Sequence, residues 1–240
     1  MKRLMVFTQL STLKIDFVRE NKINDETLSG LAQSLNNLGQ LTSFDLSCNK
    51  QYDNSKVSQT GLHRLFEALK NLKNLKELVL RVNRYEKIIT DISAVILWRS
   101  LRSLVNLKSL SLDLASNKLG NKAMSQLEKA LAALKGMETL RINVENCEWM
   151  TSRAVKVLFS RLKEMGSLMN LVVKIGCKRV DHSLVVVLTE ILYSLERLES
   201  LEIYLNRGPG AHDEDIQMLI DAISQVRRKT SLKLVSSLAP

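Results

Sequence analysis

Apolar residues return at a spacing of about 31 along the whole chain, each time within a short stretch where apolar and polar residues alternate. The middle apolar residues of these stretches are Leu13, Phe44, Leu78, Leu110, Leu140, Leu171, Leu201 and Leu232. Successive members are 31, 34, 32, 30, 31, 30 and 31 residues apart. Alternation with a period of two is typical of a half-buried strand, so the pattern predicts eight strands. A repeat of this length indicates stacked units rather than a globule around one cleft.

Between these stretches the apolar residues follow a helical spacing instead. The segments Gly61–Leu72 and Met124–Leu134 show it most clearly. Residues suited to cap helix N-termini precede several such segments: Asn24 or Asp25, Thr60, Thr90, Thr151, Asp181 and Asp213. The chain is therefore expected to alternate eight strands with about seven helices. No linker rich in Pro, Gly or Ser interrupts the pattern, so residues 1–240 are expected to form a single repeat domain.

The repeat pattern is most complete between Leu104 and Leu119, and it continues into the motif LDLASNKLG at Leu112–Gly120. This pattern resembles the leucine-rich repeat family, and the resemblance extends over essentially the whole chain. Repeats of this length that contain a helix are similar to the ribonuclease-inhibitor-like branch, and the motif is similar to long arrays in single-celled eukaryotes. The resemblance implies an α/β solenoid, a horseshoe with a concave parallel sheet and convex helices.

The resemblance also assigns a structural ladder. Asn49 and Asn117 stand where the family places a buried asparagine, whose amide satisfies backbone groups at the turn that leaves the strand. Cys147 lies seven residues after Leu140, the same offset that separates Asn117 from Leu110, and cysteine is the family's common substitute there. The third, sixth and seventh repeats lack a clear asparagine at that offset. The stretch Asn83–Lys87 in the longest repeat is expected to bulge from the horseshoe.

The net charge of +10 is spread unevenly. Residues 61–120 and 121–180 each carry 11 Lys and Arg against 5 Asp and Glu, whereas residues 181–240 carry 6 against 9. A basic centre is compatible with nucleic acid or an acidic protein as partner. The alternative is a solvated convex face, since Lys122, Lys129 and Arg153 fall in or beside predicted helices. The centre lacks a cluster of aromatic residues for base stacking, which disfavours nucleic acid.

The cysteines indicate the redox state of the cellular compartment. Cys48, Cys147 and Cys177 form no close pairs and no CxxC motif, so buried thiols in a reducing compartment are expected. This favours the cytoplasm, with a cytoskeletal, ciliary or organellar assembly left open. No apolar run is long enough to span a bilayer. The apolar part of Met1–Phe7 is too short for a secretory signal, although a short organellar presequence stays open.

The chain offers little that could catalyse a reaction. The acids Asp213–Asp215 stand before a predicted helix, where capping explains them. The segment Asn206–Gly210 lacks the spacing of a phosphate-binding loop. The histidines are scattered, so no metal site and no cofactor are expected. The sequence therefore predicts a protein that is not an enzyme and has no small-molecule substrate.

The outward-facing residues of the predicted strands are expected to form a binding surface. Residues between the strand leucines point away from the core, and those that follow each middle apolar residue are Lys14, Asp45, Val79, Ser111, Arg141, Val172, Glu202 and Lys233. Two positions further on stand Asp16, Ser47, Arg81, Asp113, Asn143, Lys174, Tyr204 and Val235. Arg and Tyr often carry interface energy. The predicted partner-binding strip comprises Arg81, Asp113, Arg141, Asn143, Lys174, Glu202 and Tyr204. The alternative is that this face is merely solvated.

The ends of the array suggest a second mode of binding. Solenoids need polar caps, yet the first repeat begins near Met1 and no helix follows the strand at Leu232. Either the chain is a fragment or partners cover its ends, and we expect the latter.

The leading hypothesis is therefore a non-catalytic scaffold or adaptor, a structural subunit of a larger intracellular assembly that binds partner proteins through the strip and the ends. One alternative is a basic module that docks on a ribonucleoprotein or an acidic filament. Another, implied by some ribonuclease-inhibitor-like arrays, is a regulator that activates a GTPase, but the rim of Arg and Asn residues that this role needs is not evident. Membrane insertion is not expected. The identity of the partner and the oligomeric state stay open.

Overall fold

The computed structural model describes most of the repeat array. The described residues are 7–17, 23–48, 57–83, 89–147, 149–175, 182–205, 214, 217–218, 220–221, 224 and 231–236. Of the sequence-based predictions, the Asn83–Lys87 bulge beyond residue 83, the caps at Asp181 and Asp213, and the residues Asn49 and Cys177 lie outside these ranges.

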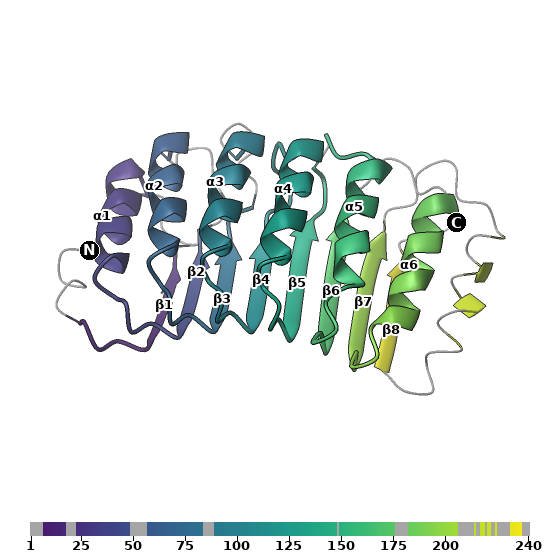
Figure 1. Ribbon diagram of the computed structural model, residues 1–240. Coiled ribbons are helices and arrows are strands. Elements are labelled where there is room, and N and C mark those ends of the chain that lie inside the picture. The colour runs from purple at the N-terminus through teal and green to yellow at the C-terminus, as the bar shows by residue number, and fades with distance from the viewer. Residues whose placement is uncertain are drawn as a thin grey trace.

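Eight strands form one sheet in chain order, and every neighbouring pair is parallel (Figure 1). The strands are β1 (Thr12–Asp16), β2 (Ser43–Ser47), β3 (Glu77–Arg81), β4 (Ser109–Asp113), β5 (Thr139–Val144), β6 (Asn170–Ile175), β7 (Ser200–Leu205) and β8 (Ser231–Ser236). The eight middle apolar residues are in register from Leu13 opposite Phe44 to Leu201 opposite Leu232. The prediction of eight strands and their register is confirmed.

Six helices link the strands and lie side by side on one face of the sheet (Figure 1). They are α1 (Asp25–Leu35), α2 (Gln59–Leu69), α3 (Asp91–Leu101), α4 (Asn121–Leu131), α5 (Ser152–Leu162) and α6 (His182–Ser194). A seventh helix is predicted between β7 and β8, where the six described residues are all helical. Parallel strands need such crossovers, because a short hairpin joins only antiparallel strands. The chain thus folds as an α/β leucine-rich-repeat solenoid.

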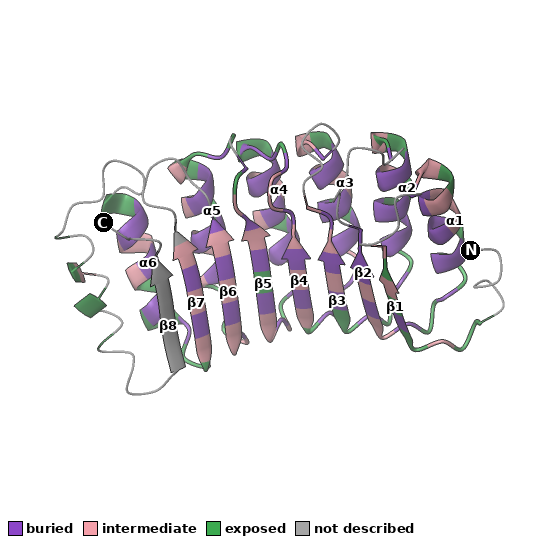
Figure 2. Ribbon diagram, turned by 180° about the vertical axis from the view of Figure 1, so that it is seen from behind, coloured by how far each residue is buried: buried purple, intermediate pink, exposed green. Residues whose placement is uncertain are grey.

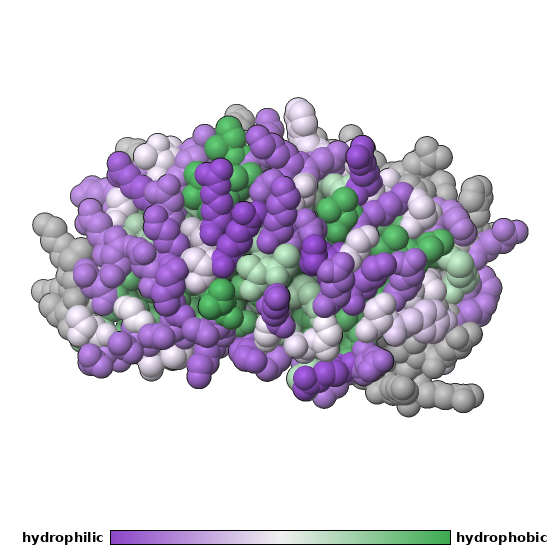
Figure 3. All heavy atoms as spheres, viewed as in Figure 1, coloured by the Kyte–Doolittle hydropathy of each residue, from purple (hydrophilic) through white to green (hydrophobic). Residues whose placement is uncertain are grey.

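The core fills the space between the sheet and the helices. Each strand from β1 to β7 turns two or three alternate apolar residues inward, and each of the helices α1 to α6 contributes its own buried stripe, as Leu78 and Leu80 of β3 and Leu97 and Leu101 of α3 show. All four side chains are fully buried, and burial of a leucine stabilises a fold by about 1.5–3 kcal/mol. The outer face of the helices is largely hydrophilic (Figure 3). No helix among the described residues is both long enough and apolar enough to cross a membrane.

The structure shows which of the predicted cap residues stand at helix N-termini. Asn24 caps α1, and its Oδ1 accepts from the Thr27 N–H at 2.8 Å. Thr60 is not a cap, because α2 begins one residue earlier and the hydroxyl of Ser58 accepts from the Thr60 N–H at 3.1 Å. Thr90 and Thr151 stand at cap positions but make no side-chain cap bond.

The helical segments predicted at Gly61–Leu72 and Met124–Leu134 correspond to α2 and α4, and each helix ends three residues before its predicted end. Leu72 and Leu134 are buried, but they lie in the turn that leads back to the sheet. Their N–H groups donate to Leu69 and Leu131, three residues back, at 3.0 Å in both cases. A buried leucine just past the helix therefore continues the apolar spacing without continuing the helix.

Polar side chains at the start of the helices tie each repeat to the next. An Oδ1 atom of Asp25 accepts from the Ser58 N–H at 2.7 Å, and Asp91 accepts from the Gly120 N–H at 2.7 Å. Gly120 permits this approach, because a Cβ there would lie 3.3 Å from the Asp91 carboxylate. These contacts satisfy backbone donors that no helix or strand reaches. Asp25 was predicted only as a possible cap and Asp91 was not identified, although an acid directly after the cap position in both repeats was a usable signal.

Backbone carbonyl groups tie the repeats together at the other end of the strands. Six of them each accept two N–H groups from the next repeat at 2.8–3.1 Å, those of Ser11, Thr42, Lys76, Lys108, Glu138 and Met169. The pattern repeats unchanged from β1 to β7, so the loops before the strands share one conformation.

The turn after β4 closes on Asn117. Its buried Nδ2 donates to the carbonyl oxygens of Val82 and Leu114, both at 2.9 Å. In the next repeat the buried Cys147 Sγ lies 3.5 Å from the Leu114 carbonyl oxygen. Ser116 precedes Asn117 with a positive φ of 56°, which turns the chain toward the next helix. Asn117 thus links two successive turns from the position that the resemblance assigned to it.

Replacing Asn117 with Ala is expected to destabilise the fold. The substitution leaves two buried carbonyl groups without this donor, which corresponds to a loss of about 1–3 kcal/mol in the free energy of unfolding. Urea denaturation followed by circular dichroism measures the change. Asn37→Ala is the matched control, because Asn37 is exposed and its Nδ2 makes one long bond to Gln33; a change within about 0.5 kcal/mol is expected there. Equal stability of the two variants would contradict the assigned role.

Cys147 is expected to resist alkylation in the folded protein. Burial raises the pKa of its thiol, and nearby backbone N–H groups offset this only in part, so the reactive thiolate is scarce. Iodoacetamide labelling at pH 8, read by mass spectrometry of the Cys147 peptide, should proceed at least about a hundredfold more slowly than in urea, since it requires opening of the fold. Labelling at the unfolded rate would show that this turn is open to solvent.

Candidate interaction surface on the open sheet face

None of the described helices lies on one face of the sheet, and we call this face the open sheet face (Figure 2). Buried and partly exposed residues alternate along its strands, as period-two geometry requires. Both predicted rows of outward residues are in register across the strands, including Arg81 opposite Asp113 and Lys174 opposite Tyr204. A further row, at the start of strands β1 to β7, was missed and consists of Thr12, Ser43, Glu77, Ser109, Thr139, Asn170 and Ser200. The same alternation, extended two residues back, would have found it.

At the N-terminal end of the open sheet face, Arg81 is engaged by its neighbours. Its guanidinium donates to Asp45 Oδ1 at 2.7 Å and to the Ser47 hydroxyl at 3.1 Å. Lys14 approaches the other oxygen of Asp45 at 3.5 Å. Asp45 retains 19% of its side-chain exposure and Arg81 39%. Arg81, which is part of the predicted strip, is held in a small network that spans β1 to β3.

Two residues of the predicted strip take part in turns. Asp113 Oδ1 accepts from the Ala115 N–H at 3.3 Å, and its other oxygen accepts from Asn83 Nδ2 at 2.7 Å. Asn143 Oδ1 accepts from the Glu145 N–H at 3.1 Å in the equivalent position of the next repeat. Such bonds from an Asx side chain to the backbone two residues on are turn-forming. Asp113 and Asn143 are therefore partly exposed but also shape the loops that leave the sheet.

Arg141 stands apart at the middle of the face. It is exposed, and its neighbours in register are Ser111 on β4 and Val172 on β6, neither of which carries a charge. It forms no ion pair with any residue that the structure describes. Val79 on β3, Ser111 and Val172 form a central strip of small side chains around Arg141, which has no charged partner among the described residues.

At the C-terminal end of the face, Lys174 and Glu202 both contact Tyr204. The Lys174 ammonium lies 4.2 Å from the centroid of the Tyr204 ring, within the range of a cation–π contact. The Tyr204 hydroxyl donates to Glu202 Oε2 at 2.8 Å. This bond, with burial and the charges of Glu202 and Glu145, raises the pKa of Tyr204 above its ordinary value. The hydroxyl thus stays protonated, and three residues from two strands form one unit.

The chemistry of this face suits binding rather than catalysis. Within the described residues no three His, Cys, Asp or Glu side chains gather in a way that could hold a metal ion. Asp45, Asp113 and Glu202 are each engaged by a neighbouring donor, so none is placed as a general base. The face presents Arg141 and its uncharged neighbours between two groups of residues that contact one another, one around Asp45 and one around Tyr204.

Comparison with known proteins gives little beyond the fold. No family model matches the sequence, and no curated protein matches it. Among solved structures, 62 chains are similar to this one. One is leiomodin-1 actin-binding site 2, with a TM-score of 0.49 and 16% identity over 68% of this chain and 88% of that chain. Another is the tropomodulin C-terminal domain of Caenorhabditis elegans, with a TM-score of 0.48 and 13% identity over 85% of this chain and 93% of that chain. Similarity this low carries no inference about partners.

Proposed function

We propose that this chain is a non-catalytic module that holds a partner protein on the open sheet face. The observation that carries the proposal is Arg141, an exposed arginine without an acidic neighbour in register, on a face where Arg81, Lys174 and Glu202 already contact neighbouring side chains. Arginine is enriched among residues that contribute most to protein–protein affinity. A carboxylate or carbonyl group of the partner would complete its hydrogen bonding with the planar geometry that guanidinium favours.

The mixed signs of the face favour a protein over a polyanion. Asp45 and Asp113 lie in the same half of the face as Lys14 and Arg81, and such carboxylates repel a phosphate backbone. Nucleic acid binding needs a continuous basic track and depends strongly on salt. A protein surface can instead meet opposite charges point by point.

Preorganisation supports the same conclusion. Arg81 and Tyr204 are already held by Asp45 and Glu202, so they lose less side-chain freedom when a partner arrives. Val79 and Val172 supply apolar area between the clusters, and both are only partly buried. A partner that covers the central strip would therefore bury aliphatic surface and pair Arg141 at the same time.

The repeat length and the helix in each repeat favour the ribonuclease-inhibitor-like branch. We propose that residues 1–240 act as one repeat domain, a scaffold or adaptor subunit within a larger intracellular assembly. Cys147 is a buried thiol that forms no disulfide with any described residue, which suits a reducing compartment such as the cytoplasm.

Charge reversal at Arg141 is expected to abolish the capture of the partner. The full chain, its Arg141→Glu variant and its Lys135→Glu variant would each be used as bait in native extract at physiological salt, with quantitative mass spectrometry as the readout. Lys135 is an exposed residue after α4, so its reversal makes the same change in net charge away from the face. A stoichiometric protein retained by Lys135→Glu and depleted by at least about tenfold in Arg141→Glu is expected, since hot-spot truncations cost 2 kcal/mol or more.

Two outcomes would contradict the proposal. One is that both variants retain every partner that the wild type captures. The other is that the captured species are nucleic acids whose binding falls by about 10³–10⁵ between 50 and 200 mM salt, as for a polyanion. In either case the open sheet face would not be the protein-binding surface.

A further inference from the structure

The loops that lead from the strands into the helices share one packing feature, and Trp149 stands beside it. An aliphatic side chain directly before the helix N-cap is buried in five described repeats, at Ile23, Val57, Ile89, Leu119 and Met150. Lys118 precedes Leu119, and Trp149 precedes Met150. Lys118 pairs with Thr90 and Trp149 pairs with Gly120, each of which is the N-cap of the preceding helix. Lys118 and Trp149 therefore occupy equivalent positions in successive repeats.

Packing within the fold does not explain the tryptophan. Trp149 is 65% exposed, and an exposed lysine is sufficient at the equivalent position of the previous repeat. The other tryptophan of the chain, Trp98, is 1% exposed and belongs to the core. Tryptophan is enriched at protein interfaces, where a few such side chains contribute most of the affinity. An indole group exposed at a position that a lysine also fills thus indicates a contact outside the chain.

The main chain of Trp149 lies against the start of α4. A Cβ atom added to Gly120 would lie 3.4 Å from the Trp149 Cβ and 3.3 Å from the Asp91 carboxylate. Exposed cations stand close to this contact along the chain: Lys118 two residues before Gly120, Lys122 two residues after it, and Arg153 four residues after Trp149. We call Trp149 with these three cations the indole patch.

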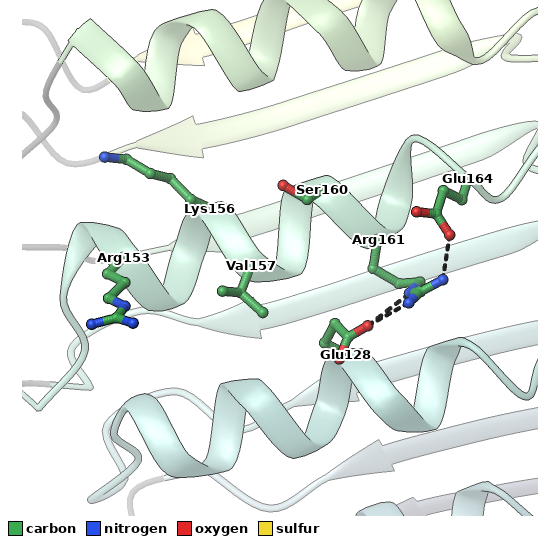
Figure 4. Close-up of a pocket in the computed structure, with 7 residues that line it drawn as sticks. All are labelled: Glu128, Arg153, Lys156, Val157, Ser160, Arg161 and Glu164. Carbon is green, nitrogen blue, oxygen red and sulfur yellow. Dashed lines mark hydrogen bonds and ion pairs between the residues drawn. The ribbon is translucent and has the colours of Figure 1, made fainter.

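Arg153 and Lys156 leave α5 in different directions (Figure 4). Arg153 extends on the side of α4, whereas Lys156 extends toward α6 and donates to the hydroxyl of Ser183. Lys156 therefore belongs to the contact between α5 and α6 and is not part of the indole patch. Toward the end of α5, Arg161 donates through Nε to Glu128 Oε1 at 2.8 Å and also pairs with Glu164, and these carboxylates raise its pKa.

The cations of the indole patch are not engaged in this way. Lys118, Lys122 and Arg153 form no ion pair with any residue that the structure describes. Asp91, which also contacts Gly120, already accepts from the Gly120 N–H at 2.7 Å. The patch thus presents positive charge beside an exposed apolar ring.

Helix stability does not explain the cations at the starts of α4 and α5. The dipole of a helix favours acids and disfavours cations at its N-terminus. α1 and α3 follow this rule with Asp25 and Asp91, whereas α4 and α5 have no acid in the first turn and carry Lys122 and Arg153 as their second residues. An acidic group bound beside these residues would offset the unfavourable charge.

We infer that the indole patch binds an acidic segment of a partner protein. Carboxylates of the segment pair with Lys118, Lys122 and Arg153, and an apolar side chain between them packs on the Trp149 ring. The charge of the patch selects for acids, and the exposed ring adds apolar area that water does not satisfy. The patch shares no residue with the strip on the open sheet face, so it is a second site beyond the proposed function.

A protein segment suits the patch better than a nucleic acid strand. Single-stranded nucleic acid is held by several aromatic side chains on which successive bases stack. Trp149 is the only aromatic residue among the described residues of the loops that follow β3, β4 and β5. One ring with cations on both sides along the chain instead matches one apolar side chain flanked by acids.

Binding of a synthetic acidic peptide tests the inference. The probe is a fluorescein-labelled peptide with glutamates on both sides of a central leucine and without tryptophan or tyrosine, and its anisotropy with the full chain measures affinity. Saturable binding is expected, and a matched peptide with glutamines in place of the glutamates should bind at least about tenfold more weakly. Unlabelled peptide should shift the Trp149 emission to shorter wavelength as the ring leaves water, since Trp98 is already buried.

Replacing Trp149 with Gln removes the indole group without changing the net charge. Peptide binding should weaken by at least about tenfold, because tryptophans rank among the residues whose truncation weakens interfaces most. Tm should not fall, because Lys118 shows that a polar side chain fits the position. Val105→Gln is the matched control, since Val105 is 61% exposed in the loop between α3 and β4, and it should leave binding nearly unchanged.

Charge reversals separate the patch from the general basic charge of the chain. Lys122→Glu combined with Arg153→Glu should weaken peptide binding by at least about tenfold and should not lower Tm, because acids suit the start of a helix. Lys70→Glu combined with Lys135→Glu changes the net charge equally at exposed positions elsewhere and should leave peptide binding nearly unchanged.

Four results would overturn the inference. The first is the absence of saturable binding to the glutamate peptide. The second is wild-type affinity in Trp149→Gln, which would remove the indole group from the site. The third is an equal loss of binding in the two double variants, which would indicate nonspecific attraction to a basic surface. The fourth is tighter binding of a single-stranded RNA oligonucleotide that Trp149→Gln also weakens, which would identify the patch as a nucleic acid site instead.

Discussion

Everything in this fold depends on the shared register between neighbouring repeats. No single strand and helix can bury both apolar faces, so each unit is stable only against the next one. The register is fixed twice, by the leucines that face one another across the sheet and by carbonyl groups such as those of Lys76 and Lys108, which accept two N–H groups each. Asn117 and Asp91 add side-chain links between successive turns. A change at one of these links acts on two repeats at once.

The sequence predicted what periodicity controls and missed what depends on neighbours in space. Leu110 and its counterparts placed every strand and its register, and the resemblance placed Asn117 at its turn, because both follow from a residue's position within one repeat. The sequence could not show that Arg81 is engaged by Asp45 or that Tyr204 donates to Glu202, since those contacts depend on rotamers across strands. Helix ends were misplaced where a leucine in the following turn continues the helical spacing.

Both faces of the molecule combine charged groups that contact one another with an exposed arginine. On the open sheet face Arg81 contacts Asp45, and Arg141 is exposed among uncharged neighbours. On the helices Arg161 pairs with Glu128, whereas Arg153 at the other end of α5 is exposed.

Site-specific photo-crosslinking tests whether the open sheet face contacts the partner. The chain would carry p-benzoylphenylalanine in place of Val172, beside Arg141 on the sheet, or in place of Ile92, an apolar residue exposed to 61% on α3. After irradiation in native extract, we expect a discrete adduct from position 172 that disappears when Arg141 is replaced by Glu. An adduct from position 92 alone, or one from position 172 that persists in the Arg141→Glu background, would contradict it.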